Sequence, residues 1–196
     1  MEPQSPFTDD EYENGVFERI SARNISLSGR TFASCSFTGC DFSGTDFLSS
    51  SFEDCSFTEC NLSGAKFTDA RMSKIALRGS KIMGIDFTAA NPFAMDISFD
   101  DCVINSCDFC GMKLKKTPFT KCEITATDFI GTDLTGADFS QTIFRDAVFD
   151  KTNLSGANFT DARGYAINPV ANNVRKAKFS LPDAVTLLEI MGIIIK

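Results

Sequence analysis

Large apolar residues recur every five positions along most of this chain. One series spans residues 32–87, and a second, in a different phase, spans residues 99–159. Of the 20 phenylalanines, 18 lie on these two series or at Phe17 and Phe179 in the same phases, and Phe7 and Phe93 lie outside the residues assigned in this way. A period of five is neither that of a helix, about 3.6 residues, nor that of a strand, about 2. The pattern therefore predicts a chain that turns a corner in every repeat.

A second pattern accompanies the first, because a small or short side chain precedes most large ones by two positions. Its members are Cys35, Cys40, Thr45, Ser50, Cys55, Cys60, Ala65, Ala70, Ala137, Thr142, Ala147, Thr152 and Ala157. One large and one small inward residue in each repeat can fill a narrow core. Gly, Ser, Asp and Asn occupy the positions between, as turns require. The two patterns together predict a solenoid.

The cysteines follow the same rule. Seven of the eight lie at the small inward position, namely Cys35, Cys40, Cys55, Cys60, Cys102, Cys107 and Cys122. We interpret them as buried small apolar residues. Cys110 completes a single CxxC with Cys107, but no second pair and no His accompany it. Redox or zinc chemistry at this pair is the alternative interpretation, and the register disfavours it by placing Cys110 on the outside.

The segments DFSGTDF, NLSGAKF, DLTGADF and NLSGANFTDA resemble the A(D/N)LXX pattern of pentapeptide-repeat proteins, over roughly residues 15–180. The resemblance implies an all-β fold, a right-handed quadrilateral β-helix with four pentapeptides in each coil. Coils in such a solenoid stack at about the 4.8 Å spacing of strands. Each coil buries its core only against its neighbours, so the ends need caps.

The expected domain organisation has three parts. Residues 1–14 form an N-terminal segment, residues 15–180 the β-helix, and residues 181–196 a short C-terminal α-helix with an apolar tail. Within the β-helix, the phase slips by two residues in a break at 88–98. Pro92 stands there in place of a core residue and cannot donate to a ladder. Either the break is a bulge or small kink between two sub-rods, or it is a projecting loop in which Pro92 and Phe93 contact a partner.

The C-terminal segment carries apolar side chains that must be buried against another surface. Pro182 suits the first turn of a helix, and Gly192 can end it. An exposed apolar tail would be an aggregation hazard. We expect the segment both to cap the solenoid and to pair with a second copy through a two-fold contact. The expected dimerisation residues are Leu187, Leu188, Met191, Ile193, Ile194 and Ile195.

Charge is uneven along the chain, whose formal net charge is −7. An acidic surface disfavours direct nucleic-acid binding and permits a basic partner. Basic residues dominate 66–82 and 113–121, whereas 123–161 is acidic. In a four-repeat coil Asp108 would lie over Asp128, although like charges in register repel. Ordinary solubility charge and turn-forming Asp stay open as the alternative. The candidate partner-binding acids are Asp108, Asp128, Asp133, Asp138, Asp146 and Asp150.

Catalytic chemistry has no visible basis in the sequence. The chain contains no His, which excludes Ser-His and Cys-His pairs. No Gly-rich phosphate loop or clustered metal-ligand motif is present. We therefore expect no enzyme activity, no catalytic or metal-binding residues and no cofactor. The sequence contains neither a secretory signal nor an apolar run of membrane-spanning length, so we expect a cytoplasmic protein that does not bind membranes.

The ending GYAINPVANNVRKAKFSLPDAVTLLEIMGIII resembles that of the topoisomerase-protecting members of the family. These include MfpA, the Qnr proteins, and the microcin- and albicidin-immunity proteins. The resemblance implies a homodimeric DNA mimic that binds DNA gyrase or topoisomerase IV and protects it from a quinolone or a peptide-type inhibitor. A protein–protein interaction scaffold with a non-topoisomerase partner is the alternative, because a fold does not fix a function.

Overall fold

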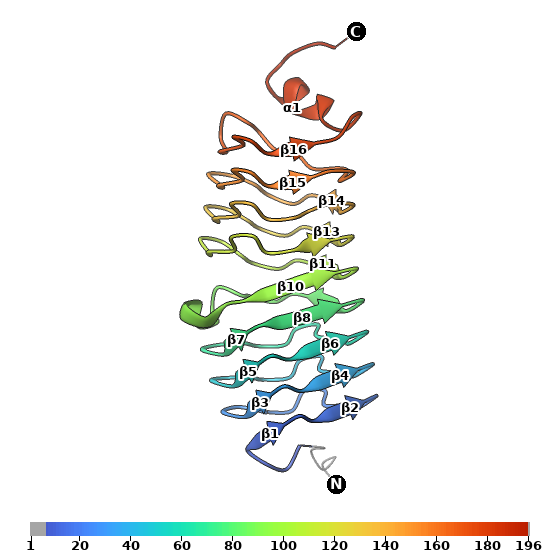
Figure 1. Cartoon of the computed structure of the whole chain (residues 1–196), viewed down its shortest axis with the longest axis vertical. Helices are drawn as coiled ribbons and strands as arrows, with labels where there is room; N and C mark the ends of the chain where they lie inside the picture. Colours follow the sequence, from blue (N-terminus) through green and yellow to red (C-terminus); the bar gives the residue numbers. More distant parts are fainter. Residues whose placement is uncertain (1–6, 196) are drawn as a thin grey trace.

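A computed structural model describes residues 7–195, which wind into a rod of stacked coils with the two chain ends at opposite ends of the rod (Figure 1). Residues 1–6 of the expected N-terminal segment and residue 196 of the expected tail lie outside the described residues. Residues 20 apart pair in parallel, as Phe37 does with Phe57, so four pentapeptides complete each coil. The rod has about eight coils. The predicted all-β quadrilateral β-helix with a short C-terminal helix is confirmed.

Each coil contributes one pentapeptide to each of four faces, which we number in chain order from the face that contains Phe17. Face 1 carries the strands β2 (Val16–Glu18), β4 (Ser36–Thr38), β6 (Ser56–Thr58), β8 (Ile75–Arg78), β10 (Ile97–Asp100), β12 (Phe119–Thr120), β15 (Asn158–Phe159) and β16 (Lys178–Phe179). Face 2 carries β9 (Lys81–Met83), β11 (Val103–Asn105), β13 (Glu123–Thr125) and β14 (Ile143–Arg145). Face 4 carries β1 (Glu11–Glu13), β3 (Thr31–Ala33), β5 (Ser51–Glu53) and β7 (Arg71–Ser73). Face 3 is joined by isolated bridges such as Asp108 to Asp128, with no longer strand among the described residues.

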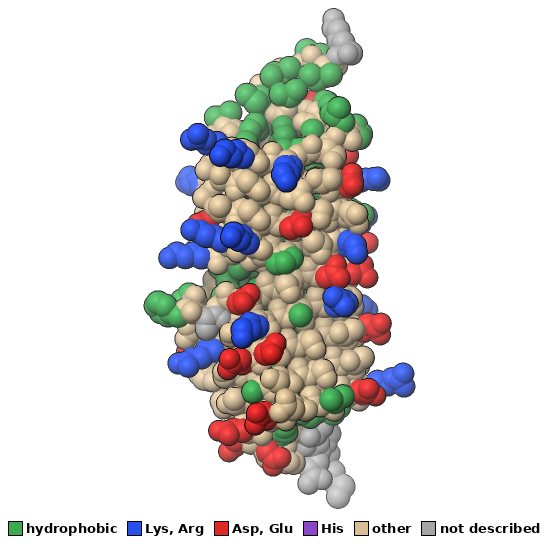
Figure 2. Space-filling view, viewed as in Figure 1, with side chains coloured by type: hydrophobic (Ala, Val, Ile, Leu, Met, Phe, Trp, Pro, Cys, Tyr) green, Lys and Arg blue, Asp and Glu red, His purple; other side chains and the backbone are tan. Residues whose placement is uncertain are grey.

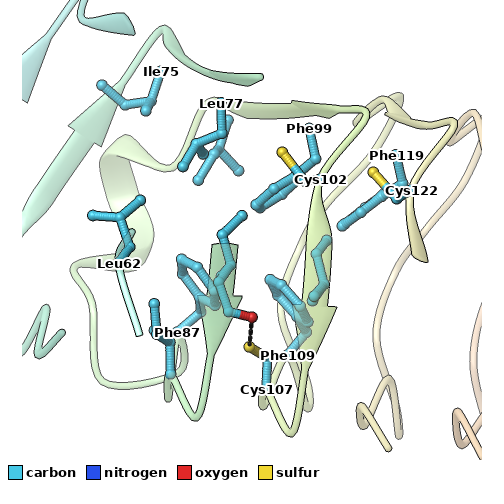
Figure 3. Close-up of a cluster of buried hydrophobic side chains, with 14 of the residues drawn as sticks. Leu62, Ile75, Leu77, Phe87, Phe99, Cys102, Cys107, Phe109, Phe119 and Cys122 are labelled. Atoms are coloured by element: carbon cyan, nitrogen blue, oxygen red, sulfur yellow. Dashed lines mark hydrogen bonds between the residues drawn. The ribbon is translucent and has the colours of Figure 1, made fainter. Parts of the chain in front are cut away.

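The core is a set of aromatic ladders. On face 1 the Phe99 and Phe119 rings stack with centroids 4.8 Å apart and planes 10° apart. Opposite faces meet edge to face, and the Phe109 and Phe119 rings lie 5.8 Å apart at 87° (Figure 3). Offset stacks and edge-to-face contacts are the arrangements that aromatic rings prefer. Both geometries recur from coil to coil, so the period of five is the direct source of the packing.

Small inward residues with a hydroxyl or thiol group donate to buried carbonyl groups of the preceding coil. The Thr132 hydroxyl donates to the Phe109 carbonyl at 2.7 Å, and the Cys60 thiol donates to the Phe37 carbonyl at 3.4 Å. Cys107 bonds the Ile82 carbonyl in the same way across the break (Figure 3). All seven cysteines predicted to lie inside are buried free thiols, whereas Cys110 is partly exposed. The structural interpretation of the cysteines is confirmed.

Most corners between repeats take a left-handed backbone conformation. The residue two positions after the large apolar one has a positive φ, as at Asp54 (53°) and Lys74 (54°). Gly supplies this conformation at no steric cost, and Asp and Asn tolerate it. At Gly164 only Gly fits, because a Cβ there would lie 2.3 Å from the Phe144 backbone carbonyl oxygen.

The break adds two residues to one coil. The register there is 22 rather than 20, since Ile75 pairs with Ile97 and Ile82 with Ile104. The extra residues form a one-turn 3-10 helix, η1 (Pro92–Ala94), which stands out from face 4 (Figure 1). The Phe87 and Phe109 rings still stack across the break, 4.7 Å apart and 8° from parallel. The break is therefore a projecting bulge: the ring stack of face 3 continues past it, whereas the strand pairing of face 4 ends at β7.

The N-terminal end of the rod is closed by Phe7, which the sequence analysis left unassigned although it lies ten residues before Phe17 in the same phase. Its side chain is 1% exposed, and its ring lies 5.1 Å from that of Phe17 and 5.7 Å from that of Phe32. The first strand, β1, begins at Glu11, so the stacked coils begin before the expected boundary at residue 15. Part of the segment assigned to residues 1–14 thus belongs to the solenoid.

The C-terminal end carries the helix α1 (Val185–Ile190), which covers the last coil (Figure 1). Pro182 lies before this helix rather than in its first turn, so the helix is shorter than the sequence predicts. Gly192 ends it with a φ of 80°, as expected. Of the apolar residues in this segment, Leu187 packs against the core, whereas Ile194 is 84% exposed.

The register makes a direct prediction at Phe139, which is 0% exposed. Phe139→Asp should lower the free energy of unfolding by at least about 4 kcal/mol, because it removes a buried ring and introduces an unpaired charge. Phe93→Asp is the matched control, since the Phe93 side chain is 97% exposed. Thermal unfolding followed by circular dichroism measures both, and equal melting temperatures would contradict the register.

The buried thiols predict a loss of stability at high pH. Burial raises the pKa of Cys60 from 9.0 to about 12. The unfolded thiol ionises first, so the contribution of Cys60 is complete below pH 9 and is lost as pH rises toward the folded value. Between about pH 8 and pH 10, Cys60→Ser should lose about 1 kcal/mol less stability than the unaltered chain. Ser80 holds the equivalent position one coil on, so serine fits there. Identical pH dependence in denaturant unfolding would contradict the assignment.

Candidate interaction surface

Three aspartates form a column on face 3, each directly above the last. Backbone bridges join Asp86 to Asp108 and Asp108 to Asp128. The expected placement of Asp108 over Asp128 is therefore confirmed. Asp150 lies on the same face one coil further on, just after Phe149, and Asp146 lies at the adjoining corner with a φ of 54°. We call Asp86, Asp108, Asp128, Asp146 and Asp150 the acidic face.

Aspartates of this column also form the turns of their own repeats. The Asp108 carboxylate accepts a hydrogen bond from the Cys110 backbone N–H at 2.8 Å, and Asp86 accepts one from the Thr88 backbone N–H at 2.9 Å. The turn-forming interpretation is thus correct for both residues. A carboxylate has two oxygens and keeps its charge when one of them accepts. The turn role and an interaction role are therefore compatible.

Two of the six candidate acids lie on other faces. Asp133 lies on face 4, where Lys115 approaches its carboxylate at 3.3 Å. Burial alone would raise the pKa of Asp133, but hydrogen bonds from Thr135 and the Lys115 ammonium outweigh it and hold the pKa below its usual value. Asp138 lies on face 1, where it accepts from the Asn158 amide at 2.9 Å. The structure therefore gathers Asp108, Asp128, Asp146 and Asp150 and separates them from Asp133 and Asp138.

Sequence reasoning missed Asp86, which completes the column. Before the break it lies 22 rather than 20 positions from Asp108, so a search at multiples of 20 passes over it. Adding the two-residue slip of the apolar series to the interval of 20 would have identified Asp86. Apolar side chains accompany the acids on this face, since Ile130 is 39% and Val148 41% exposed.

Cys110 lies beside Asp108 on the acidic face and is a poor nucleophile. Burial and the neighbouring Asp108 raise the pKa of its thiol from 9.0 to about 11. Cys107 points inward, so the CxxC motif does not form a two-thiol site. Among the described residues, no group of three or more His, Cys, Asp or Glu is placed to hold a metal ion.

The other predicted contact residues are exposed. Phe93 projects from face 4 on η1, where the Asn91 side chain accepts a hydrogen bond from its N–H at 3.1 Å. Pro92 is exposed beside it. Apolar side chains also gather at the C-terminal end of the rod (Figure 2). The exposed members of the predicted dimerisation set are Leu188, Met191, Ile193, Ile194 and Ile195.

Within residues 7–195, no helix has the length and apolar character needed to cross a membrane.

Comparisons with known proteins agree with this geometry. Residues 30–106 and 50–129 match the family model described as a pentapeptide repeat region, and residues 122–161 match eight copies of the pentapeptide repeat. Two trypsin-treated forms of QnrB1, described as a plasmid-mediated fluoroquinolone resistance protein, have similar structures. One is 21% identical, with a TM-score of 0.68 over 99% of this chain and 95% of the QnrB1 chain. The other is 18% identical, with a TM-score of 0.63 over 95% of this chain and 100% of the QnrB1 chain.

At these identities the structural likeness shows a shared fold. A search of curated protein sequences finds no match. The family models together span residues 30–161, which is more than half of the chain. The chain therefore belongs to the pentapeptide-repeat family.

Proposed function

We propose that this protein is a non-catalytic DNA mimic that binds DNA gyrase or topoisomerase IV and protects it from a quinolone or a peptide-type inhibitor. The observation that carries the proposal is the acidic face. Asp86, Asp108 and Asp128 stand in consecutive coils. Adjacent strands repeat at about 4.8 Å, so the column presents regularly spaced negative charge along a straight rod. Duplex DNA also presents a dense linear array of negative charge.

The shared fold with QnrB1 supports the same proposal. QnrB1 is described as a fluoroquinolone resistance protein, and its chain is matched along nearly its whole length. The C-terminal sequence resembles that of topoisomerase-protecting proteins, as set out above. A cytoplasmic location follows from the proposal, because the topoisomerase partner acts on chromosomal DNA.

We further propose that the protein acts as a homodimer joined at its C-terminal ends. Ile194 is 84%, Met191 49% and Ile195 48% exposed, and all three lie within residues 191–195. An exposed contiguous apolar patch on a soluble protein marks an interaction site. Two rods joined there would double the length of the acidic face along one axis.

A supercoiling assay tests the function. Gyrase is titrated with this protein, with and without a quinolone or an albicidin-type poison. The proposal expects restored supercoiling in the presence of the poison and inhibition at high protein concentration. No effect across the titration would reject it in favour of an interaction scaffold with a different partner.

Charge-neutral variants test the acidic face within that assay. Asp86→Asn, Asp108→Asn and Asp128→Asn combined should raise the concentration needed for the effect about tenfold, if each exposed ion pair contributes about 0.5 kcal/mol. Asn keeps the turn, as Asn61 does by accepting from the Ser63 N–H at 3.1 Å. The control combines Asp41→Asn, Asp133→Asn and Asp138→Asn, which remove the same charge from the other three faces. Equal losses in the two sets would contradict a role for the acidic face.

The dimer proposal has its own test. Ile194→Asp should convert the dimer to a monomer without unfolding it, because this side chain contacts little within its own chain. Val16→Asp is the matched control at the opposite end of the rod, where Val16 is 73% exposed. Light scattering coupled to size exclusion measures the mass of each variant. A dimer that survives Ile194→Asp but not Val16→Asp would place the contact at the wrong end.

A further inference from the structure

The projection on face 4 borders a pocket that the acidic face does not share. Pro92, Phe93 and Met95 line one side of this pocket, and Gly111, Met112 and Lys113 of the next coil line the other. Its volume is about 260 Å³. That is below the ~300–1,000 Å³ of pockets that hold drug-sized ligands, so it suits one or two side chains. Met side chains adapt to varied apolar partners.

Basic residues surround the projection. Arg71 lies in β7, which contacts η1 from the preceding coil. Lys113 lies at the pocket in the following coil, and Lys74 and Lys116 occupy left-handed corners of face 4 with φ values of 54° and 59°. In the space-filling view Lys and Arg side chains lie along this edge of the rod above and below the projection (Figure 2). We call Arg71, Lys74, Lys113 and Lys116 the basic patch.

The acids near this surface offset only part of the basic patch. Asp133 is paired with Lys115 rather than with a member of the patch. Asp69 and Asp96 are exposed neighbours. Glu53 and Asp54, also exposed, lie one coil before Ser73 and Lys74 and offset Arg71 and Lys74. The positive charge that remains lies at Lys113 and Lys116, in the coil after the projection.

The projection is held in place rather than loosely attached. At its start the Asn91 N–H donates to the Ala70 carbonyl at 2.9 Å, and at its end the Asp96 N–H donates to the Met72 carbonyl at 2.8 Å. The Asn91 side chain caps the turn between them. Phe93 is therefore presented outward, 97% exposed, from a backbone anchored at both ends. A pre-ordered aromatic side chain binds with little further loss of conformational entropy.

We propose that Phe93, the pocket beside it and the basic patch form a docking surface for an acidic segment of a partner protein, one that carries an apolar side chain between Asp or Glu residues. The apolar side chain fills the pocket against Phe93 and Met112, and the flanking carboxylates face the patch. Charge complementarity selects this occupant over a basic segment. The apolar lining favours a peptide over nucleic acid, which would pair the cations with phosphates and leave the pocket empty.

This surface goes beyond the proposed function, because it attracts a partner of the opposite charge to the one that the acidic face attracts. It lies on face 4, adjacent to the acidic face at a corner of the rod. The experiment below contains no topoisomerase, so its outcome and that of the supercoiling assay are independent.

The test uses the full chain and a fluorescein-labelled peptide in which Leu-Phe is flanked on each side by Asp-Glu-Asp. Anisotropy should show saturable binding that weakens with salt, and amide shifts in NMR spectra should concentrate at residues 92–96 and 111–116. Phe93→Ala should raise the dissociation constant at least about tenfold, as for an aromatic anchor. Lys113→Glu with Lys116→Glu should have a similar effect.

Matched controls separate this surface from general effects. Val170→Ala removes another exposed apolar side chain, 78% exposed on face 3, and should leave binding unchanged. Lys151→Glu with Lys178→Glu makes the same charge change on other faces and should have a much smaller effect. A Lys-Arg-Lys version of the peptide should not bind. Absence of binding at millimolar acidic peptide, equal affinity for Phe93→Ala, or tighter binding of oligothymidine at the same residues would each overturn the proposal.

Discussion

Parallel stacking of coils at one fixed spacing is the constraint on which this molecule depends. Each inward side chain has one neighbour above and one below in the same column, and it meets the opposite column across a narrow core. The Phe99, Phe119 and Phe139 rings stack at 4.8 and 5.0 Å because their backbones pair in register. Small inward residues with a hydroxyl or thiol group close the same geometry by donating to carbonyl groups of the coil before them, as Thr152 does to Phe129 at 2.7 Å. Core, turns and surface columns all follow from that single repeat.

Much of the fold was predictable because one period controls it, and the exceptions are features that the period does not determine. The phase of Phe139 or Cys60 follows from counting in fives. The phase of Phe7 follows in the same way, ten residues before Phe17, but its role in closing the end of the rod does not, because the period does not show where the stacked coils begin. The face on which the projection stands follows from the pattern, since Pro92 takes the place of the core residue after Phe87, but the 3-10 turn and the outward direction of Phe93 do not. Asp86 was missed because a search at intervals of 20 leaves out the two-residue slip.

The four faces of the rod carry different charges, which the overall composition does not show. The net charge of −7 describes an acidic protein, yet face 3 carries the acidic column and face 4 carries Lys113 and Lys116. The acids of residues 123–161 are contiguous in sequence, but successive repeats send them to different sides. The charge of one face of a solenoid is therefore found by comparing residues one coil apart, and not by counting charges along a continuous stretch of sequence. Surfaces of opposite sign can lie around the same axis without compromising the core that both share.

The bulge at Pro92–Ala94 shows what this architecture tolerates. The Phe87 and Phe109 rings stack as closely across the 22-residue coil as others do across coils of 20. The strand pairing of face 4 already ends at β7 and resumes where Lys113 bridges Asp133, so an added segment at this corner interrupts no further pairing. Lengthening it costs mainly the slowly growing entropy of loop closure. The corner between Asn91 and Asp96 is therefore a suitable site for inserting foreign loops. A loop inserted there would be displayed on the side of a rigid solenoid.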